Sequence, residues 1–225
     1  MNSLKIIKLL KKDIFYLHRS LGGPANIKTL RYIKKFIPKI KIKSFKSDEK
    51  IYDWKSPKIW TVDTAYIKDD NNKKIIDIKN NFLHVLNYSS SINKVVNRKK
   101  LFKNLYYLKK SPNAIPYVTS YYYKKWGFCL KYNDLKNLNA KKYKVVIDSK
   151  FSNKKNNYSD YLIRGKSKKE IIFSTYICHP NLGNDNFSGI IINTLLANYL
   201  KTKKNLKYSY RFVFIPETIG SINYI

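Results

Sequence analysis

The chain has 225 residues, of which 44% are hydrophobic and 15% are aromatic. This much apolar surface can offset the entropy of folding, which excludes a disordered chain and allows one core with a smaller second unit. No run approaches the roughly 20 uninterrupted apolar residues of a membrane-spanning helix. Lys residues and Asp13 interrupt the N-terminal segment, which therefore lacks the apolar region of a signal peptide. We expect a cytoplasmic protein with no membrane partner.

The formal net charge of +32 suggests a nucleic-acid-binding protein, but the type and spread of the basic residues argue against a specific one. The Lys residues are scattered along the whole chain and do not form one block or stripe. Arg, which pairs with phosphate and guanine through two parallel hydrogen bonds, is rare. We expect weak, salt-sensitive attraction to polyanions and no specific nucleic-acid partner. The five Arg residues are Arg19, Arg31, Arg98, Arg164 and Arg211.

Two amphipathic helices are predicted first in the chain. Apolar residues recur at spacings of three and four over residues 4–18 and again from Ile27 to Ile37, and Gly22 to Pro24 separate the two runs. His18 falls at the end of the first helix, where a capping or packing role is the simplest interpretation.

From about residue 40 the hydrophobic period changes from 3.6 to two, which predicts a small β-rich domain. His84 lies within one of its strand-like runs and is interpreted as a structural histidine. One helical segment, residues 97–108, interrupts the runs. The strand-like runs are residues 58–67, 74–78, 82–88 and 143–148.

The last third of the chain predicts a βαβ unit. Residues 170–177 and 208–215 are apolar runs of strand length, and a helix is predicted over 187–202. The two strands should be parallel and buried. The residues predicted for the inner face of the helix are Ile192, Leu195, Leu196 and Tyr199.

Polar side chains follow both strands of this unit. His179 and Asp185 come after the first strand, and Glu217 comes after the second. Ligands of open α/β sheets gather at the carboxyl ends of the strands. Imidazole and carboxylate are ligands of catalytic zinc, and a nearby carboxylate can act as a base. By spacing alone a metal site stays one of two interpretations, because Asp185 could simply cap the following helix.

Several segments resemble the zinc-dependent aminopeptidase superfamily, and within it the bacterial aminopeptidase-like proteins found among polysaccharide-biosynthesis genes. The resemblance covers almost the whole chain, with the segments in the family's order. These segments are HRSLGGPANIKTL (18–30), IYDWKSPKIW (51–60), LHVLNYS (83–89), IPYVTSYY (115–122), WGFCL (126–130), TYICHPNLGNDNFSG (175–189) and YRFVFIPETIGS (210–221).

The resemblance implies an α/β fold, namely an incomplete three-layer αβα zinc-peptidase-like core with a small inserted β-rich domain. The expected divisions are residues 1–49 and 144–225 for the core and residues 50–143 for the insert. It also implies that His179 and Asp185 are zinc ligands, and that Glu217 is the general base that takes a proton from the attacking water.

The chain departs from the family's pattern in two places. Thr218 stands where many two-zinc relatives have a second Glu that binds metal, so one zinc ion is expected in preference to two. An acidic residue and a late His of the family would lie beyond Ile225, and two protein ligands hold zinc poorly. We expect a fragment with weak zinc binding, little activity and low solubility, whose partner is either a second copy or a missing C-terminal half.

The leading hypothesis is therefore a metal-dependent hydrolase of an amide bond, in a peptide or in an acylated amino-sugar. A non-catalytic, peptidase-derived binding or assembly protein is the alternative, which Thr218 and the missing ligands favour. A nucleic-acid-binding protein comes third.

Overall fold

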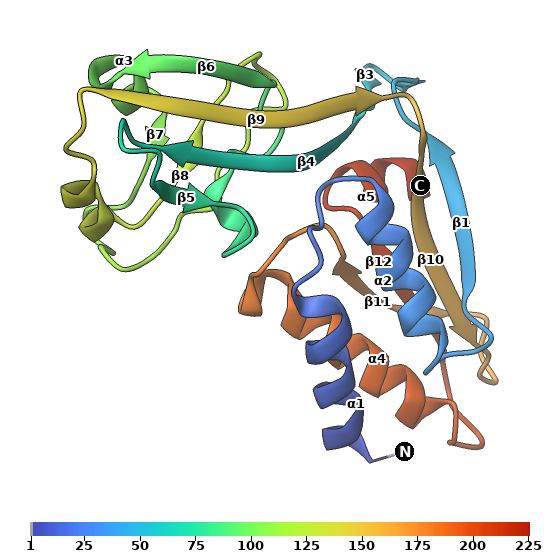
Figure 1. Ribbon diagram of the computed structural model, residues 1–225. Coiled ribbons are helices and arrows are strands. Elements are labelled where there is room, and N and C mark those ends of the chain that lie inside the picture. The colour runs from blue at the N-terminus through green and yellow to red at the C-terminus, as the bar shows by residue number, and fades with distance from the viewer. Residues whose placement is uncertain (1) are drawn as a thin grey trace. The chain divides into compact units, whose positions relative to one another are not determined.

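The computed structural model describes residues 2–225, which divide into two compact units (Figure 1). Unit 1 contains the residues up to Ile59 together with Asn153–Ile225, and unit 2 is Trp60–Ser152. Unit 2 begins and ends later in the chain than the insert expected at residues 50–143. It ends later because its last strand continues without a break to Ser152.

A four-stranded mixed sheet forms the centre of unit 1, in the order β1-β10-β12-β11. The first two neighbouring pairs are antiparallel, whereas β11 and β12 are parallel, with Tyr176 opposite Ile215. The predicted βαβ unit is therefore present with parallel strands. The four strands are β1 (Lys41–Lys46), β10 (Lys155–Ile163), β11 (Glu170–Tyr176) and β12 (Ser209–Ile215).

Helices cover the two faces of this sheet unequally. Residues of α1, α2 and α4 share one hydrophobic core with Phe212 and Phe214 of β12. On the opposite face of the sheet, Tyr224 of α5 packs edge-on against Tyr158 of β10. The predicted first helix over residues 4–18 is shorter, because a π-helical turn, η1 (Lys11–Phe15), follows α1. The helices are α1 (Ser3–Leu10), α2 (Pro24–Lys34), α4 (Gly189–Leu200) and α5 (Ile219–Tyr224).

The inner face predicted for α4 is correct in part, since Leu195 and Leu196 pack against the core whereas Ile192 and Tyr199 do not. Ile192 and Tyr199 are 55% and 57% exposed, whereas Ile190 and Ala197 are buried. The sequence GIIINTLLANYL is apolar nearly all round, so its spacing cannot choose a face. Asn193 faces the sheet, because its side-chain amide donates to the backbone carbonyls of Phe173 and Val213 at 3.1 and 3.3 Å.

The expectation that both strands of the βαβ unit are buried is wrong for β11. Most of its residues are exposed, whereas β12 is buried over Phe212–Ile215. The difference follows from position, since β12 lies between β10 and β11 while β11 is the last strand of the sheet.

Unit 2 contains a four-stranded antiparallel sheet in the order β5-β4-β9-β6 and several short elements. Two predictions fail here: residues 82–88 hold a 3-10 turn, and the helix expected over 97–108 is limited to α3. His84 contacts the backbone carbonyl of Cys129 through Nδ1 at 2.8 Å, as a structural histidine would. The elements of this unit are β4 (Ile59–Lys68), β5 (Lys74–Asp77), η2 (Phe82–His84), β6 (Ile92–Asn97), α3 (Arg98–Phe102), β7 (Leu105–Tyr106), β8 (Phe128–Cys129), η3 (Tyr132–Asn137) and β9 (Lys142–Ser152), and a small hairpin of β2 (Lys50–Ile51) and β3 (Trp54–Lys55) precedes them in unit 1.

Within residues 2–225, none of the helices combines the length and the apolar character needed to cross a bilayer.

Candidate active site

The parallel pairing of β11 and β12 brings the segments that follow the two strands together. Past the last paired residues, Tyr176 and Ile215, the backbone N–H of Ile177 still donates to the carbonyl of Ile215 at 3.0 Å. Both strands end at the carboxyl edge of the sheet. His179 follows Tyr176, and Glu217 follows Ile215, within three residues of the last paired position. This is the edge at which open α/β sheets bind ligands.

His179 lies between the two predicted carboxylates. Its Nδ1 atom is 2.9 Å from Oδ1 of Asp185, and its Nε2 atom is 2.9 Å from Oε2 of Glu217. The imidazole is buried, with 2% of its side chain exposed, whereas the side chains of Asp185 and Glu217 are 65% and 38% exposed. All three candidate residues therefore meet, with the histidine inside and the carboxylates toward solvent.

One of these two contacts needs an additional proton or a metal ion. A neutral imidazole carries one N–H and can donate to one carboxylate only, and an ionised carboxylate has no proton to give in return. With a carboxylate oxygen at hydrogen-bond distance from each ring nitrogen of His179, one of the two N···O contacts needs either a second proton or a metal ion between its atoms. Buried charges are stable when they are paired in this way.

The donor set fits one zinc ion in part. Imidazole and carboxylate are preferred zinc ligands, but catalytic zinc normally has three protein ligands. Asp185 and Glu217 approach opposite ring nitrogens of His179, so an ion at one nitrogen has one of the two carboxylates beside it. The neighbouring loop also has unmet polar capacity, since Oδ1 of Asn181 and both amide atoms of Asn186 are buried without a hydrogen-bond partner among the described residues.

Cys178 was not predicted as part of the site, but its Sγ atom lies with the ligand atoms of His179 and Glu217 in a cluster within 4.8 Å. Burial raises the pKa of the Cys178 thiol to about 12. We assign the residue a positioning role because of its contact with the backbone of Glu217. Its sulfur accepts a hydrogen bond of 3.2 Å from the backbone N–H of Glu217 and fixes the start of that segment.

Arg19 supports the histidine from behind and was also missed by sequence reasoning. Its side chain is fully buried, and its Nε atom donates to the backbone carbonyl of His179 at 3.0 Å. A second bond from Nη1 reaches the carbonyl of Ile14. Burial lowers the pKa of the Arg19 guanidinium to about 10. The scarcity of Arg beside abundant Lys was the available signal, because a rare Arg retained in such a chain indicates a specific contact.

Thr218 follows Glu217 but is exposed and starts α5 with a positive φ of 53°. The structure shows no contact between Thr218 and either predicted ligand, His179 or Asp185. Thr218 therefore does not take the place of a second metal-binding Glu.

A cavity of about 410 Å³ adjoins Asp185. It extends from the end of β11 to the start of α4, and Asp185 and Asn186 line one side of it. A substrate group next to Asp185 can be accommodated here.

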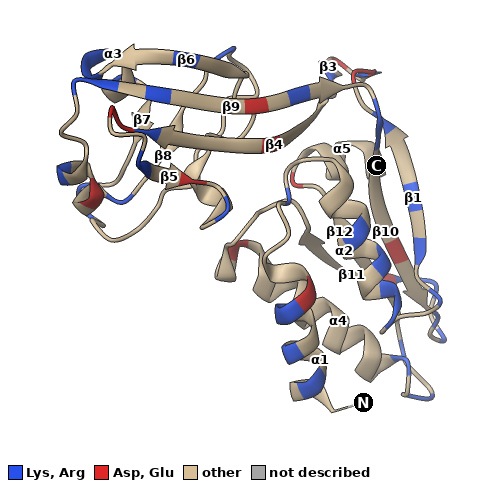
Figure 2. Cartoon of the chain, viewed as in Figure 1, with Lys and Arg blue, Asp and Glu red and all other residues tan. Residues whose placement is uncertain are grey.

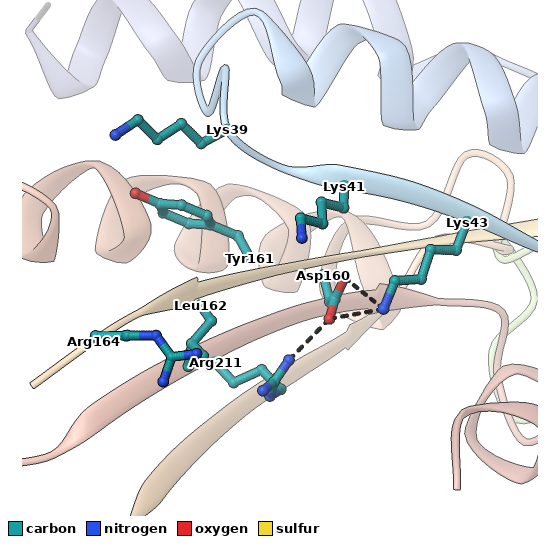
Figure 3. Close-up of a pocket in the computed structure, with 8 residues that line it drawn as sticks. All are labelled: Lys39, Lys41, Lys43, Asp160, Tyr161, Leu162, Arg164 and Arg211. Atoms are coloured by element: carbon teal, nitrogen blue, oxygen red, sulfur yellow. Dashed lines mark hydrogen bonds and ion pairs between the residues drawn. The ribbon is translucent and has the colours of Figure 1, made fainter. Parts of the chain in front are cut away.

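A second cavity, of about 430 Å³, has a different character (Figure 3). It lies over β1, β10 and β12, and Asp160 is its one acidic residue. Arg211 bonds Asp160 at 2.9 Å and Glu170 at 2.5 Å, so this guanidinium is already paired. The cavity has no imidazole and no exposed carboxylate, and we assign it no part in the candidate chemistry. Its other basic residues are Lys39, Lys41, Lys43 and Arg164.

Comparison with known sequences identifies the family. Residues 8–225 match a family described as a domain of unknown function, DUF4910. The chain belongs to this family. A Clostridium acetobutylicum protein, whose name describes polysaccharide biosynthesis and an aminopeptidase-like domain, is 41% identical over 214 residues. That match covers 95% of this chain and 49% of the relative, so the chain spans about half the length of this relative.

Solved structures share the fold. A C. acetobutylicum crystal structure named as a peptidase has a TM-score of 0.92 at 40% identity, covering 99% of this chain and 52% of that one. A zinc aminopeptidase from Bacillus subtilis has a TM-score of 0.59 at 12% identity, covering 99% of this chain and 64% of that one. An M28 peptidase precursor from Shewanella amazonensis has a TM-score of 0.64 at 9% identity, covering 99% and 66%. The predicted α/β, zinc-peptidase-like fold and the resemblance to aminopeptidase-like proteins over part of their length are confirmed.

Proposed function

We propose that this chain carries part of the active site of a zinc-dependent hydrolase that cleaves an amide bond, in a peptide or in an acylated amino-sugar. The observation that carries the proposal is the position of buried His179 between Asp185 and Glu217, at 2.9 Å from each. The names and folds of the relatives support a peptidase-like hydrolase at the level of the family. The names of these relatives do not favour the alternative of a non-catalytic binding protein.

In this proposal His179 and Asp185 hold the ion, since they come from the same loop and already meet at Nδ1. When bound, zinc supplies a Lewis acid that polarises the scissile carbonyl and makes water more acidic. Buried His179 keeps one ligand fixed, with Arg19 bonded to its backbone carbonyl. Such support from outside the ligand set typically affects metal affinity tenfold or more.

Glu217 moves the proton. Its carboxylate is partly exposed, while its backbone N–H is held by the sulfur of Cys178. The side chain can therefore leave Nε2 of His179 while its backbone stays in place. It accepts a proton from the attacking water and passes it to the departing amine. A contribution of about 10²–10⁴ in rate is typical of a positioned general acid–base.

Three substitutions test these roles. His179→Ala and Asp185→Asn should weaken zinc binding at least tenfold, measured by calorimetric titration against a competing chelator. Glu217→Gln should retain zinc and abolish whatever hydrolysis of aminoacyl anilides or acylated amino-sugars the zinc-loaded chain shows. Glu170→Gln is the control, because that carboxylate pairs with Arg211 on the sheet and should leave both readouts unchanged.

Equal zinc affinity in the wild type and in His179→Ala would refute the metal site. Loss of zinc in Glu217→Gln together with retention in Asp185→Asn would show that the ion binds at Nε2, and that the proposed roles of the two carboxylates are reversed.

A further inference from the structure

A cavity on the sheet of unit 1 is lined mainly by cationic side chains (Figure 3). Five of its eight lining residues are Lys or Arg, whereas 46 of the 225 residues in the chain are basic. Arg211 lies four residues before Ile215, which ends β12 at the carboxyl edge, so roughly 13 Å of strand separates Arg211 from that edge. The cavity is therefore separate from the site around His179. We call it the basic cavity, defined by Lys39, Lys41, Lys43, Arg164 and Arg211.

Strand alternation explains how cationic side chains gather on one face of this sheet. Lys41 and Lys43 of β1 alternate with Ile42, which packs against the hydrophobic core beneath α1, α2 and α4. In β12, Arg211 is followed by Phe212, which belongs to the same core. Successive side chains of a strand point to opposite faces of the sheet. The three cationic side chains therefore lie on the face opposite the helical core.

Two of the five cations are already paired with carboxylates. Nζ of Lys43 lies 3.2 Å from Oδ1 of Asp160, and Nη1 of Arg211 donates to Oδ2 of Asp160 at 2.9 Å (Figure 3). Arg211 also donates from Nη2 to Glu170 at 2.9 Å. The side chain of Asp160 is 8% exposed, and a buried carboxylate is stable when it is paired in this way. These contacts fix the floor of the basic cavity.

The other three cations of the basic cavity are not paired in this way. Among the ion pairs of residues 2–225, none involves Lys39, Lys41 or Arg164. Five cations beside the carboxylates of Asp160 and Glu170 leave three positive charges without a counter-charge. Two of the chain's five Arg residues also line this one cavity, and Arg presents a planar fork of N–H donors that matches the oxygens of a phosphate.

We propose that the basic cavity binds a small molecule that carries a phosphate monoester or a diphosphate group. Arg164 binds the phosphate oxygens through its N–H groups, and Lys39 and Lys41 neutralise the remaining charge. Leu162, which lines the same cavity, contacts the organic part of the ligand. The volume of about 430 Å³ lies within the range of small-molecule sites.

The charge of the ligand follows from the charge of the cavity. A phosphate monoester carries about 1.5 to 2 negative charges at pH 7, and a diphosphate carries more, so these groups match the three cations that lack a counter-charge. A phosphodiester of a nucleic acid carries a single charge and leaves most of the cavity's charge unmatched. Binding at the basic cavity requires neither zinc nor hydrolysis.

Diffuse attraction of anions to the net charge of +32 is the alternative explanation for binding of any phosphate. At physiological salt, exposed charges more than about 8 Å apart are largely screened from each other, so lysines elsewhere contribute little inside the cavity. A substitution in the basic cavity should therefore weaken binding, whereas loss of the same charge elsewhere should not.

The test is calorimetric titration of the 225-residue chain with pyrophosphate, inorganic phosphate and dimethyl phosphate at about 150 mM salt. Zinc is left out, because pyrophosphate chelates it. Pyrophosphate should bind one site per chain and more tightly than inorganic phosphate, and dimethyl phosphate should bind most weakly. Lys41→Gln combined with Arg164→Gln should weaken pyrophosphate binding at least tenfold. The matched control is Lys28→Gln combined with Arg31→Gln on the exposed side of α2, which removes the same charge from unit 1 and should change the affinity less than twofold.

Three outcomes would overturn the proposal. The first is an equal loss of affinity in the two double variants, since binding would then reflect the overall charge of the chain. The second is full displacement of pyrophosphate by an oligonucleotide without terminal phosphates, which would make the cavity a contact for the nucleic-acid backbone. The third is the absence of saturable binding by the wild type at about 10 mM pyrophosphate. Circular dichroism of each variant establishes that it is folded, and failure of zinc binding or hydrolysis leaves this result unchanged.

Discussion

The guanidinium of Arg19 bonds the backbone carbonyl of His179, although the two residues are 160 positions apart. This contact ties the segment after the first helix to the segment that carries the candidate metal ligand. Burying the charged guanidinium of an Arg costs free energy because the group loses its hydration. Its hydrogen bonds offset this cost, and removing one partner destabilises the fold mainly because the other partner is left buried without a hydrogen bond.

Replacement of Arg19 should therefore affect both stability and the site. Arg19→Met removes the donor to the carbonyl of His179, while the carbonyl of Ile14 keeps the backbone N–H of Leu17, so we expect a loss of about 1–3 kcal/mol in the free energy of unfolding. Zinc affinity should fall as well, because the histidine backbone loses its support. Urea unfolding and calorimetric titration measure the two effects. Arg31→Lys on the exposed side of α2 is the control and should change neither. An Arg19→Met protein with wild-type zinc affinity would show that the contact does not position His179.

The packing of Gly189 against Thr175 gives a steric prediction. A Cβ at position 189 would lie 2.3 Å from Oγ1 of Thr175, so Gly189→Ala should destabilise the protein by about 1–3 kcal/mol. Removing the hydroxyl with Thr175→Ala should recover much of this loss in the double variant. Gly183→Ala is the control in the preceding loop, where an added Cβ meets nothing within 4 Å. Thermal unfolding measures the stability of the two single variants, the double variant and the control. If the stability changes of Gly189→Ala and Thr175→Ala simply add in the double variant, the contact does not cause the loss.

His18 makes the stability depend on pH in a defined direction. Burial lowers the pKa of His18 from 6.5 to about 4. The unfolded chain therefore takes up a proton below pH 6.5 that the folded chain does not, so stability falls as the pH drops from about 6.5 to about 4 and is unaffected by this group above that range. The contribution is at most about 3 kcal/mol.

The comparison that isolates this effect is between the wild type and His18→Gln. Denaturant unfolding across pH 4 to 7 should show a shallower decline in the variant, since other groups titrate equally in both proteins. Parallel declines would mean that His18 is protonated as readily in the folded state as in the unfolded state.

The net charge of +32 predicts weak, salt-dependent binding to nucleic acids. Lysines are spread over both units, so binding should be independent of base sequence (Figure 2). Affinity for duplex DNA should fall at least about tenfold between 50 and 200 mM salt. Fluorescence anisotropy with two unrelated duplexes measures this. A duplex preferred by more than about 1.4 kcal/mol would reveal a specific nucleic-acid site, which the scattered charge does not predict.

Local pattern was enough to predict the βαβ unit and the meeting of its polar residues. The ends of parallel neighbours are adjacent by geometry, so His179 and Glu217 could be placed from strand assignments alone. The inner face of α4 could be predicted only in part, for Leu195 and Leu196 but not for Ile192 and Tyr199. Apolar residues occur on nearly all sides of this helix. Asn193 faces the sheet and bonds two backbone carbonyls there, and such contacts cannot be predicted from hydrophobic periodicity.

Contacts between distant segments were also beyond reach. The bond from Arg19 to His179 and the support of Glu217 by Cys178 depend on how three segments pack, and nothing in their local sequences identifies the partners. In unit 2, residues 82–88 alternate like a strand but contain a 3-10 turn, because short apolar runs do not distinguish a strand from a buried turn.

The most direct measurement is an anomalous difference map at the zinc edge from crystals of the chain grown with one equivalent of zinc. The account predicts one peak at about 2.0–2.2 Å from Nδ1 of His179 and from a carboxylate oxygen of Asp185, with Glu217 close enough to reach a water beside the ion. A peak elsewhere on the protein would contradict this account. So would the absence of a peak next to His179 when titration in solution shows that the protein is saturated with zinc.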